Sequence, residues 1–186
     1  MIVYREILPE DAEKLLAWRT TTRVAAGFVG TLSPDPERQR RWILDARQSQ
    51  DSYHWITTLD GQDFGYMRFH HWNREQRNCR LGFYIGDEAF SPCYVTIQDD
   101  LLSFLFYCLD LNHVVSYVLE DNRPSNRFNV AYGFTRRPEM DAEATQSAGK
   151  ATCAYTLSRE DWRRLRHLES CKAIFPVTLW EASPFK

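Results

Sequence analysis

Residues 113–134 read HVVSYVLEDNRPSNRFNVAYGF, and this stretch contains two adjacent secondary-structure elements. The run 113–119 is rich in β-branched and aromatic residues and is apolar almost throughout, which is typical of a strand buried in a sheet. Residues 123–132 follow the pair Asp121-Asn122 and end at Gly133, a residue suited to the left-handed conformation that closes many helices. The stretch therefore predicts a buried strand followed directly by a short helix.

The sequence before this stretch predicts an antiparallel meander and a long helix. Strands at 53–59 and 64–72 are joined by Asp60-Gly61, a pair that favours the positive backbone angles of a type I′ hairpin turn. A polar turn at 73–77 leads to a third strand at 78–85. Apolar residues then recur at helical spacing over residues 95–109, which indicates a helix with one buried face.

The two ends of the chain add elements of both kinds. The first part predicts a strand at 2–7, a helix after Pro9, a loop at 23–33 and a helix beginning at Asp35-Pro36. The last part predicts a strand starting in 134–137, a polar loop at 138–149, a strand at 150–157 and a helix capped by Ser158. We expect a single domain over residues 1–171 and an irregular tail at 172–186 that packs on the domain or extends from it. The order β-α-α-β-β-β-α-β-α-β-β predicts an α/β (α+β) fold with a mixed, mostly antiparallel sheet and helices on both faces.

Composition narrows the classes of partner. The 186-residue chain has a net charge of −2, which does not favour nucleic acid as a partner. It has neither the apolar run of a signal peptide nor a stretch that could cross a bilayer, so we expect a cytoplasmic protein without a membrane partner. The five cysteines are odd in number and form no C-x-x-C pair, which predicts reduced thiols and no metal site.

This order of elements resembles the GNAT superfamily of acetyl-CoA-dependent N-acetyltransferases, and four local motifs agree with it. The motifs are LLAWRT (15–20), YHWITTLDGQDFGYMRF (53–69), DNRPSNRFNVAYGF (121–134) and AYTLSREDWRRL (154–165). Residues 65–84, which include NCRLGFY, are most similar to the nucleotide-amino-sugar N-acetyltransferases of pseudaminic acid biosynthesis, followed by the ribosomal-protein alanine acetyltransferases. The resemblance covers residues 1–165 and implies a V-shaped opening between the strands near 81–85 and 114–118.

The resemblance implies acetyl-CoA or another acyl-CoA as co-substrate, held at this opening. In the family, backbone groups hold the pantetheine arm, and a Gly-rich loop at a helix N-terminus receives the pyrophosphate. The corresponding loop here, FSPCYVT at 90–96, has no glycine, and Pro92 lacks an N–H, so we expect weakened or altered donor binding. Asn122 either bonds the pantetheine arm or serves as a turn residue. The resemblance assigns to the donor Phe83, Tyr84, Ile85, Ser91, Cys93, Tyr94, Val95, Thr96 and Asn122.

The acid and base residues of the family are replaced in this chain. The Tyr that many members use as general acid aligns with Asn129, and Ser125 stands where the ribosomal-protein branch has a serine proposed for that role. The usual Glu is Arg80, which cannot act as a base. His70 is a candidate replacement, because an unperturbed histidine titrates near neutrality. The candidate catalytic residues are therefore Ser125, Asn129 and His70, with a helix cap as the alternative for Ser125.

Four residues are candidates for the acceptor site. Trp18 and Arg19 lie where relatives receive the acceptor, and the alternative is a tryptophan packed in the core and an arginine in solvent. His71 and Trp72 lie at the mouth of the central hairpin. Neighbours on a strand face opposite sides, so only one of His70 and His71 can point into the cleft.

The sequence thus predicts an N-acyltransferase that moves an acetyl or other acyl group to a primary amine of a small acceptor. By resemblance alone, the acceptor is a nucleotide-linked amino sugar. A non-catalytic GNAT-fold binding module and an acyltransferase with a carrier-protein donor are the alternatives. The missing glycines favour the first alternative, and the carrier's phosphopantetheine, which has no pyrophosphate, favours the second. A homodimer is left open.

Overall fold

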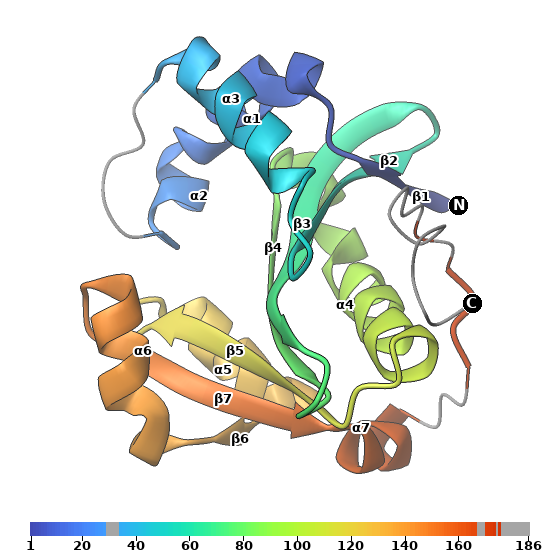
Figure 1. The fold of residues 1–186 in the computed structure, drawn as a ribbon, viewed down its shortest axis with the longest axis vertical. Helices are drawn as coiled ribbons and strands as arrows, with labels where there is room; N and C mark the ends of the chain where they lie inside the picture. The colour runs from blue at the N-terminus through green and yellow to red at the C-terminus, as the bar shows by residue number, and fades with distance from the viewer. Residues whose placement is uncertain (29–33, 167–169, 174, 176–186) are drawn as a thin grey trace.

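The computed structural model describes residues 1–28, 34–166, 170–173 and 175, and it is built around a seven-stranded sheet (Figure 1). The strand order is β1-β2-β3-β4-β5-β7-β6. Only the β4–β5 pair is parallel, and the other neighbours are antiparallel. The predicted mixed, mostly antiparallel sheet is therefore confirmed. The strands are β1 (Ile2–Glu6), β2 (Tyr53–Leu59), β3 (Gln62–Asn73), β4 (Asn78–Ile85), β5 (His113–Leu119), β6 (Thr135–Arg136) and β7 (Thr152–Ser158).

Helices cover both faces of this sheet. Figure 1 shows α1, α2 and α3 beside one face of β3 and β4, α4 beside the other face, and α5 and α6 flanking β5 and β7. The α-helices are α1 (Ala12–Arg19), α2 (Thr22–Ala25), α3 (Pro36–Ala46), α4 (Tyr94–Ser103), α5 (Arg123–Tyr132), α6 (Asp141–Ala148) and α7 (Arg159–Arg166). The shorter helical segments are η1 (Pro9–Asp11), η2 (Glu88–Cys93), a π-helical turn η3 (Phe104–Cys108) and η4 (Pro138–Met140).

The turn and cap residues act as the sequence predicts. Asp60 and Gly61 have φ angles of 50° and 82°, so both central positions of the β2–β3 turn are left-handed. Asp35 caps α3 by accepting a hydrogen bond from the backbone N–H of Glu37 at 3.0 Å, with Pro36 at the first helical position. Gly133 ends α5 with a φ of 110°.

Two predicted loops contain helices. Residues 138–149 form η4 and α6 rather than a polar loop, and α6 buries only Ala144, so it has no apolar stripe to reveal it. Within the predicted loop 23–33, residues up to 25 belong to α2, and residues 29–33 lie outside the described part of the chain. The predicted helix 95–109 begins at Tyr94 and changes to a π-helical turn at Phe104.

The sheet separates two hydrophobic clusters. Alternation along β2 sends Trp55 to the cluster under α4 and Ile56 to the cluster under α1 and α3. Phe175 stacks on Tyr4 with ring centroids 4.2 Å apart and belongs to the α4 cluster. Residues 174 and 176–186 of the predicted tail lie outside the described residues.

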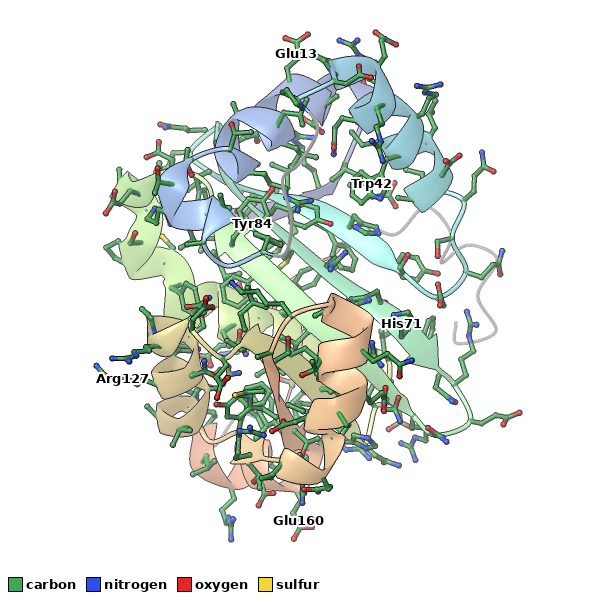
Figure 2. All side chains as sticks on the ribbon, turned by 90° about the vertical axis from the view of Figure 1, so that its left-hand side faces the viewer. Glu13, Trp42, His71, Tyr84, Arg127 and Glu160 are labelled. Atoms are coloured by element: carbon green, nitrogen blue, oxygen red, sulfur yellow. The ribbon has the colours of Figure 1, made fainter. Side chains whose placement is uncertain are left out.

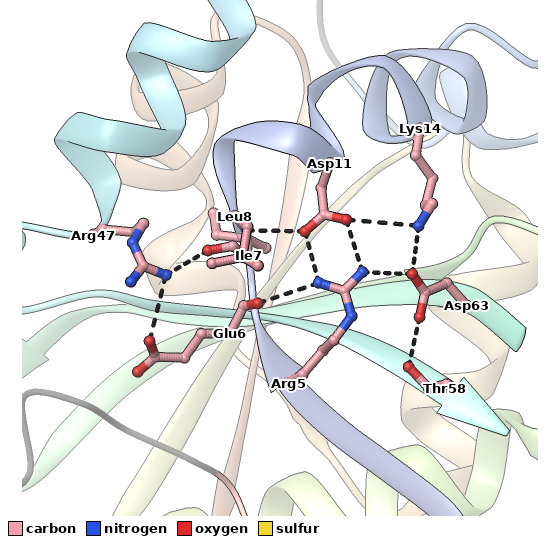
Figure 3. Close-up of polar contacts among 9 residues, drawn as sticks. All are labelled: Arg5, Glu6, Ile7, Leu8, Asp11, Lys14, Arg47, Thr58 and Asp63. Carbon is pink, nitrogen blue, oxygen red and sulfur yellow. Dashed lines mark hydrogen bonds and ion pairs between the residues drawn. The ribbon is translucent and has the colours of Figure 1, made fainter. Parts of the chain in front are cut away.

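A polar network joins β1 to η1, α1 and the β2–β3 hairpin (Figure 3). The guanidinium of Arg5 forms a two-point contact with Asp11, with both N–O distances 2.7 Å, and also contacts Asp63. Lys14 pairs with Asp63 as well, and the Thr58 hydroxyl donates to it at 2.7 Å. Two carboxylates shared by two cations hold β1, η1, α1 and the β2–β3 hairpin together.

Candidate active site

The central feature of the molecule is the separation of β4 from β5. The two strands pair only from Asn78–Arg80 against His113–Val115, and beyond these residues no further pairing continues. The opening therefore starts at Leu81 on β4, as predicted, and at Ser116 on β5, two residues later than the predicted 114. A cleft of about 700 Å³ occupies this opening and continues under α1–α3. The predicted V-shaped splay is confirmed.

One face of the β3–β4 pair forms the floor of the cleft. Three cross-strand pairs lie along it, and they place Tyr66 opposite Tyr84, Arg68 opposite Gly82, and His70 opposite Arg80. Because side chains alternate between faces, all six positions point to the α1–α3 side. A buried sheet face is usually apolar, so this polar row indicates a surface that meets a ligand.

The outer edge of β4 presents backbone groups to the opening. The Gly86 N–H donates to the Phe64 carbonyl at 2.7 Å, and in an antiparallel pair the backbone groups of every second residue point to the partner strand. The backbone N–H and C=O of Tyr84 therefore point to β3, whereas those of Phe83 and Ile85 face the splay. Arg23 donates to the Ile85 carbonyl at 2.7 Å, in agreement with this orientation. Of the three β4 residues that the resemblance assigns to the donor, Phe83 and Ile85 therefore present backbone groups to the opening, and Tyr84 does not.

Helix α5 brings three predicted residues to the opposite wall. Asn122 is the N-cap of α5, because its side-chain oxygen accepts from the Ser125 N–H at 3.3 Å. The cap that was the alternative role for Ser125 therefore belongs to Asn122. The Ser125 hydroxyl has no hydrogen-bond partner among the described residues and lines the cleft. Asn129 is buried and donates its amide to the Ser116 hydroxyl at 3.1 Å, which ties α5 to the open part of β5.

Tyr132, one turn after Asn129, does not replace the missing general acid. Its hydroxyl contacts Asp99 on α4, its ring lies under the guanidinium of Arg166, and it does not line the cleft.

The segment before α4 differs from an anion-binding loop. Residues 88–93 form the 3₁₀ helix η2, which runs directly into α4. Its Pro92 has no N–H, the Tyr94 N–H bonds the Ser91 carbonyl, and the Ser91 hydroxyl donates to the Glu88 carbonyl at 2.7 Å. Phe90 stacks on Phe64 with centroids 4.6 Å apart and fixes the segment. The residues present fit a pantetheine channel but leave few free donors for a pyrophosphate.

Of the residues assigned to the donor, some line the cleft and others do not. Ser91 and Tyr94 line the cleft, together with Phe83, Tyr84 and Ile85. Cys93, Val95 and Thr96 do not line it, because Cys93 packs against the α4 cluster and the other two side chains are exposed elsewhere on α4.

The environment of His70 changes the chemistry expected of it. His70 lines the cleft, but burial, followed by the charges of Arg68, His71 and Arg80, lowers its pKa to about 3. It is neutral at pH 7 and a weak base, so the property that made it a candidate base is removed. Its neighbour on β2, His54, is also buried, its pKa lies near 4, and its Nδ1 lies 2.6 Å from the Tyr66 hydroxyl.

Of the four acceptor candidates, only Arg19 lines the cleft. Trp18 packs in the α1–α3 cluster against Gly86, where an added Cβ would lie 2.2 Å from the indole. Trp72 is 7% exposed in the α4 cluster, so its assignment to the acceptor site is corrected to a core residue. His71 is exposed at a bulge, with a φ of 53°, and does not reach the cleft, whereas Tyr84 lies beneath the α1–α3 helices (Figure 2).

Several residues of the cleft were missed from the sequence. Tyr66 and Arg68 line the cleft and alternate with apolar neighbours ahead of His70. This period-two pattern is visible in the sequence, but only the adjacent histidines were named as candidates. Arg23, Phe28 and Trp42 come from helices and loops whose approach to β3 and β4 has no local sequence signal.

Comparison with known proteins agrees with this geometry. A family model described as "Acetyltransferase (GNAT) domain" matches residues 2–135, and the chain therefore belongs to this family. No curated protein matches the sequence closely enough to count as a relative.

Solved acetyltransferases share the fold at low sequence identity. A putative acetyltransferase from T. thermophilus has a TM-score of 0.70 at 17% identity, with 89% of this chain and 90% of that chain covered. The Campylobacter jejuni N-acetyltransferase PseH in complex with acetyl coenzyme A has a TM-score of 0.64 at 16% identity, with coverages of 86% and 99%. SpeG, a spermidine N-acetyltransferase from Vibrio cholerae, in a mutant form, has a TM-score of 0.72 at 11% identity, with coverages of 90% and 98%.

The described residues contain no group of three or more His, Cys, Asp or Glu side chains placed to hold a metal ion. Within the same residues, no helix has both the length and the apolar character required to span a bilayer.

Proposed function

We propose that the chain is an acyl-CoA-dependent N-acyltransferase that transfers an acetyl or other acyl group to a primary amine of a small acceptor. The observation that carries the proposal is the open β4–β5 splay, bordered by free backbone groups on one side and by Ser125 and Asn129 of α5 on the other. Membership of the GNAT acetyltransferase family supports the same activity.

The chain's own residues have three tasks in this reaction. The N–H groups of Phe83 and Ile85 face the opening and are the donors suited to a developing oxyanion. As the amine nitrogen bonds the carbonyl carbon and the C–S bond breaks, the nitrogen loses one proton; the Ser125 hydroxyl passes its own proton to the departing thiolate and takes up the proton from the nitrogen, while Asn129 holds α5 in place against β5. The donor thioester supplies the acyl group, and positioning of the two substrates provides most of the rate.

An amine that is already neutral when it attacks needs no strong base. The described residues that line the cleft offer none: His70 has a pKa of about 3, and Arg80 stands where the family often has a Glu. The arginines that line the cleft favour the neutral amine over the ammonium ion, because like charges repel. Nucleotide-linked amino sugars are the first acceptors to test.

Two alternatives depend on η2. Its few free donors favour either a carrier-protein donor, whose phosphopantetheine has no pyrophosphate, or a binding module without turnover. The unpartnered Ser125 hydroxyl in the splay favours turnover.

A thermal-shift screen with acetyl-CoA, longer acyl-CoAs and phosphopantetheine separates these functions. A ligand that binds only the folded protein raises its melting temperature by mass action. We expect acyl-CoA to raise it. A shift with phosphopantetheine and none with any acyl-CoA would support the carrier-protein donor, and no shift with any of these ligands would contradict the proposal.

A further inference from the structure

The cleft is strongly cationic although the chain is not. Four arginines line it, Arg19, Arg23, Arg68 and Arg80, and its lining includes no Asp or Glu within the described part of the chain. The whole chain has a net charge of −2, so positive charge is concentrated at this one concave surface. A cleft lined by one sign of charge raises the local concentration of ligands of the opposite sign.

Two of the four arginines are already engaged. Arg80 forms an ion pair with Glu143 at 2.6 Å, and its guanidinium lies over the ring of Tyr117. Arg23 donates to the carbonyls of Ile85 and Gly86 at the end of β4. These contacts use both guanidinium groups to hold neighbouring elements together, Arg23 at the end of β4 and Arg80 at α6.

Arg19 and Arg68 have no carboxylate partner in the described residues. The guanidinium of Arg19 lies 4.4 Å from the ring centre of Phe28. Phe28 meets Tyr84 edge-on at 5.6 Å, and Tyr84 packs on Tyr66 at 5.2 Å. Both arginines act electrostatically on the hydroxyls of both tyrosines, so the four side chains form one cluster on the cleft floor.

Two polar atoms of this cluster are buried and have no hydrogen-bond partner among the residues that the structure describes, the Nε of Arg19 and the hydroxyl of Tyr84. Tyr84 is 8% exposed and lines the cleft. A buried polar group without a partner is unfavourable for folding, so its persistence in a cleft wall points to a ligand that completes it. The arginine atoms are donors only, and the tyrosine hydroxyl is able to donate.

We propose that the acceptor amine also carries a carboxylate or phosphate group, and that Arg19, Arg68 and Tyr84 bind this group. The assignment rests on the proposed acyltransferase function and names its class of acceptor. Guanidinium groups match the geometry of carboxylates and phosphates, and charge-assisted hydrogen bonds of this kind are the strong ones. Polyamines, which carry only positive charge, are the acceptors that this cleft disfavours.

The test compares matched pairs of amines by calorimetry. Glucosamine 6-phosphate is paired with glucosamine, and α-amino acids are paired with their carboxamides, so that phosphate and carboxylate sources are distinguished. Spermidine is the cationic probe. In at least one pair we expect the member that bears the phosphate or carboxylate, called here the anionic member, to bind about tenfold or more tightly than the partner that lacks this group, a difference of about 1.4 kcal/mol.

Variants locate the effect at the cluster. Arg68→Gln and Tyr84→Phe should reduce the preference for the anionic member, the first of them abolishing it, whereas Arg41→Gln on the exposed side of α3 should keep it. Tyr84→Phe removes only a hydroxyl, so it keeps the test valid if Arg68→Gln does not fold.

The outcomes separate this inference from the proposed function. Preferential anion binding without transfer from any acyl-CoA would keep the anion site and overturn the acyltransferase. Transfer to spermidine or to amines that lack a phosphate or carboxylate, with no preference for the anionic member of a pair, would keep the acyltransferase and overturn the anion site. Equal binding within every pair, weak or absent binding included, also overturns the anion site.

Discussion

Asn122, the N-cap of α5, and Ser125, three residues later in its first turn, have separate tasks. Asn122 caps the helix, whereas the Ser125 hydroxyl has no partner among the described residues and faces the cleft. We therefore expect Ser125→Ala to lower kcat by about 10²-fold with little change in KM, because the hydroxyl acts in the transition state. Steady-state kinetics and the melting temperature are measured on the same variant.

Asn122→Ala is the matched control for this change. It removes the cap and should lower the free energy of unfolding by about 1 kcal/mol. Full turnover in Ser125→Ala would rule out the proton-transfer role.

At the scale of the element, the end of β4 depends on a close contact with α1. The indole of Trp18 occupies the space that a side chain at Gly86 would need, 2.2 Å from an added Cβ. Gly86→Ala should lower the free energy of unfolding by about 1–3 kcal/mol, as overpacking does, since the half-buried ring of Trp18 is packed against the α1–α3 cluster and cannot move aside freely. Urea unfolding measures the change, with Gly61→Asn, at an open left-handed turn, as control. An unchanged midpoint for Gly86→Ala would show that α1 shifts readily.

The helix η2 offers a second test at this scale. Ser91→Gly and Cys93→Gly, combined with Pro92→Ala, restore glycine and one N–H ahead of α4. We expect this triple variant to bind acetyl-CoA about tenfold more tightly by calorimetry, because free N–H groups at a helix N-terminus attract phosphate. Pro92→Ala alone is the control. Unchanged affinity in the triple variant would show that η2 does not face the pyrophosphate.

The sequence predicts elements well where local chemistry is strong. The turn at Asp60-Gly61, the cap at Asp35 and the stop at Gly133 all depend on residues whose preferences need no tertiary context. Helix α6 was missed because only Ala144 is buried, and its other side chains give no periodic signal. The cap of α5 was harder to assign for a related reason, since Asn and Ser are both good caps and only the backbone distinguishes them.

At the scale of the whole molecule, stability depends on the charged network in Figure 3. Burial alone raises the pKa of Asp63, but hydrogen bonds from Arg5, Lys14 and Thr58 outweigh it and lower this pKa to about 2. A carboxyl with a depressed folded pKa stabilises the protein above its unfolded pKa of about 3.9, and this contribution is lost as the pH falls toward 2.

Asp63→Asn should therefore lower the free energy of unfolding at pH 7 by about 1–2 kcal/mol. The difference from the wild type should stay constant from pH 7 to about 5 and shrink below pH 4. Urea unfolding as a function of pH measures it, with Asp60→Asn, an exposed position on the β2–β3 turn, as control. A difference that does not change with pH would contradict the role of the charge.

The residues that form the cleft are only partly predictable from the sequence. The position of the cleft follows from the order of elements, and the family resemblance leads to Arg19, His70, Ser125 and Asn129, which are among the candidates that line it. Arg19 on α1 and Arg68 on β3 come together in one cluster only because α1 lies over the sheet in the folded protein. The pKa of His70 likewise depends on burial, which the sequence of a strand does not determine.

The central claim is that this chain transfers an acyl group from acyl-CoA to an amine. The most direct measurement follows free thiol release from acetyl-CoA in the presence of each amine pair, with the acylated product identified by mass spectrometry. The account predicts amine-dependent thiol release that matches the product formed and falls about 10²-fold in Ser125→Ala. Absence of product with every acyl-CoA and amine, from protein that is folded and binds acyl-CoA, would contradict it.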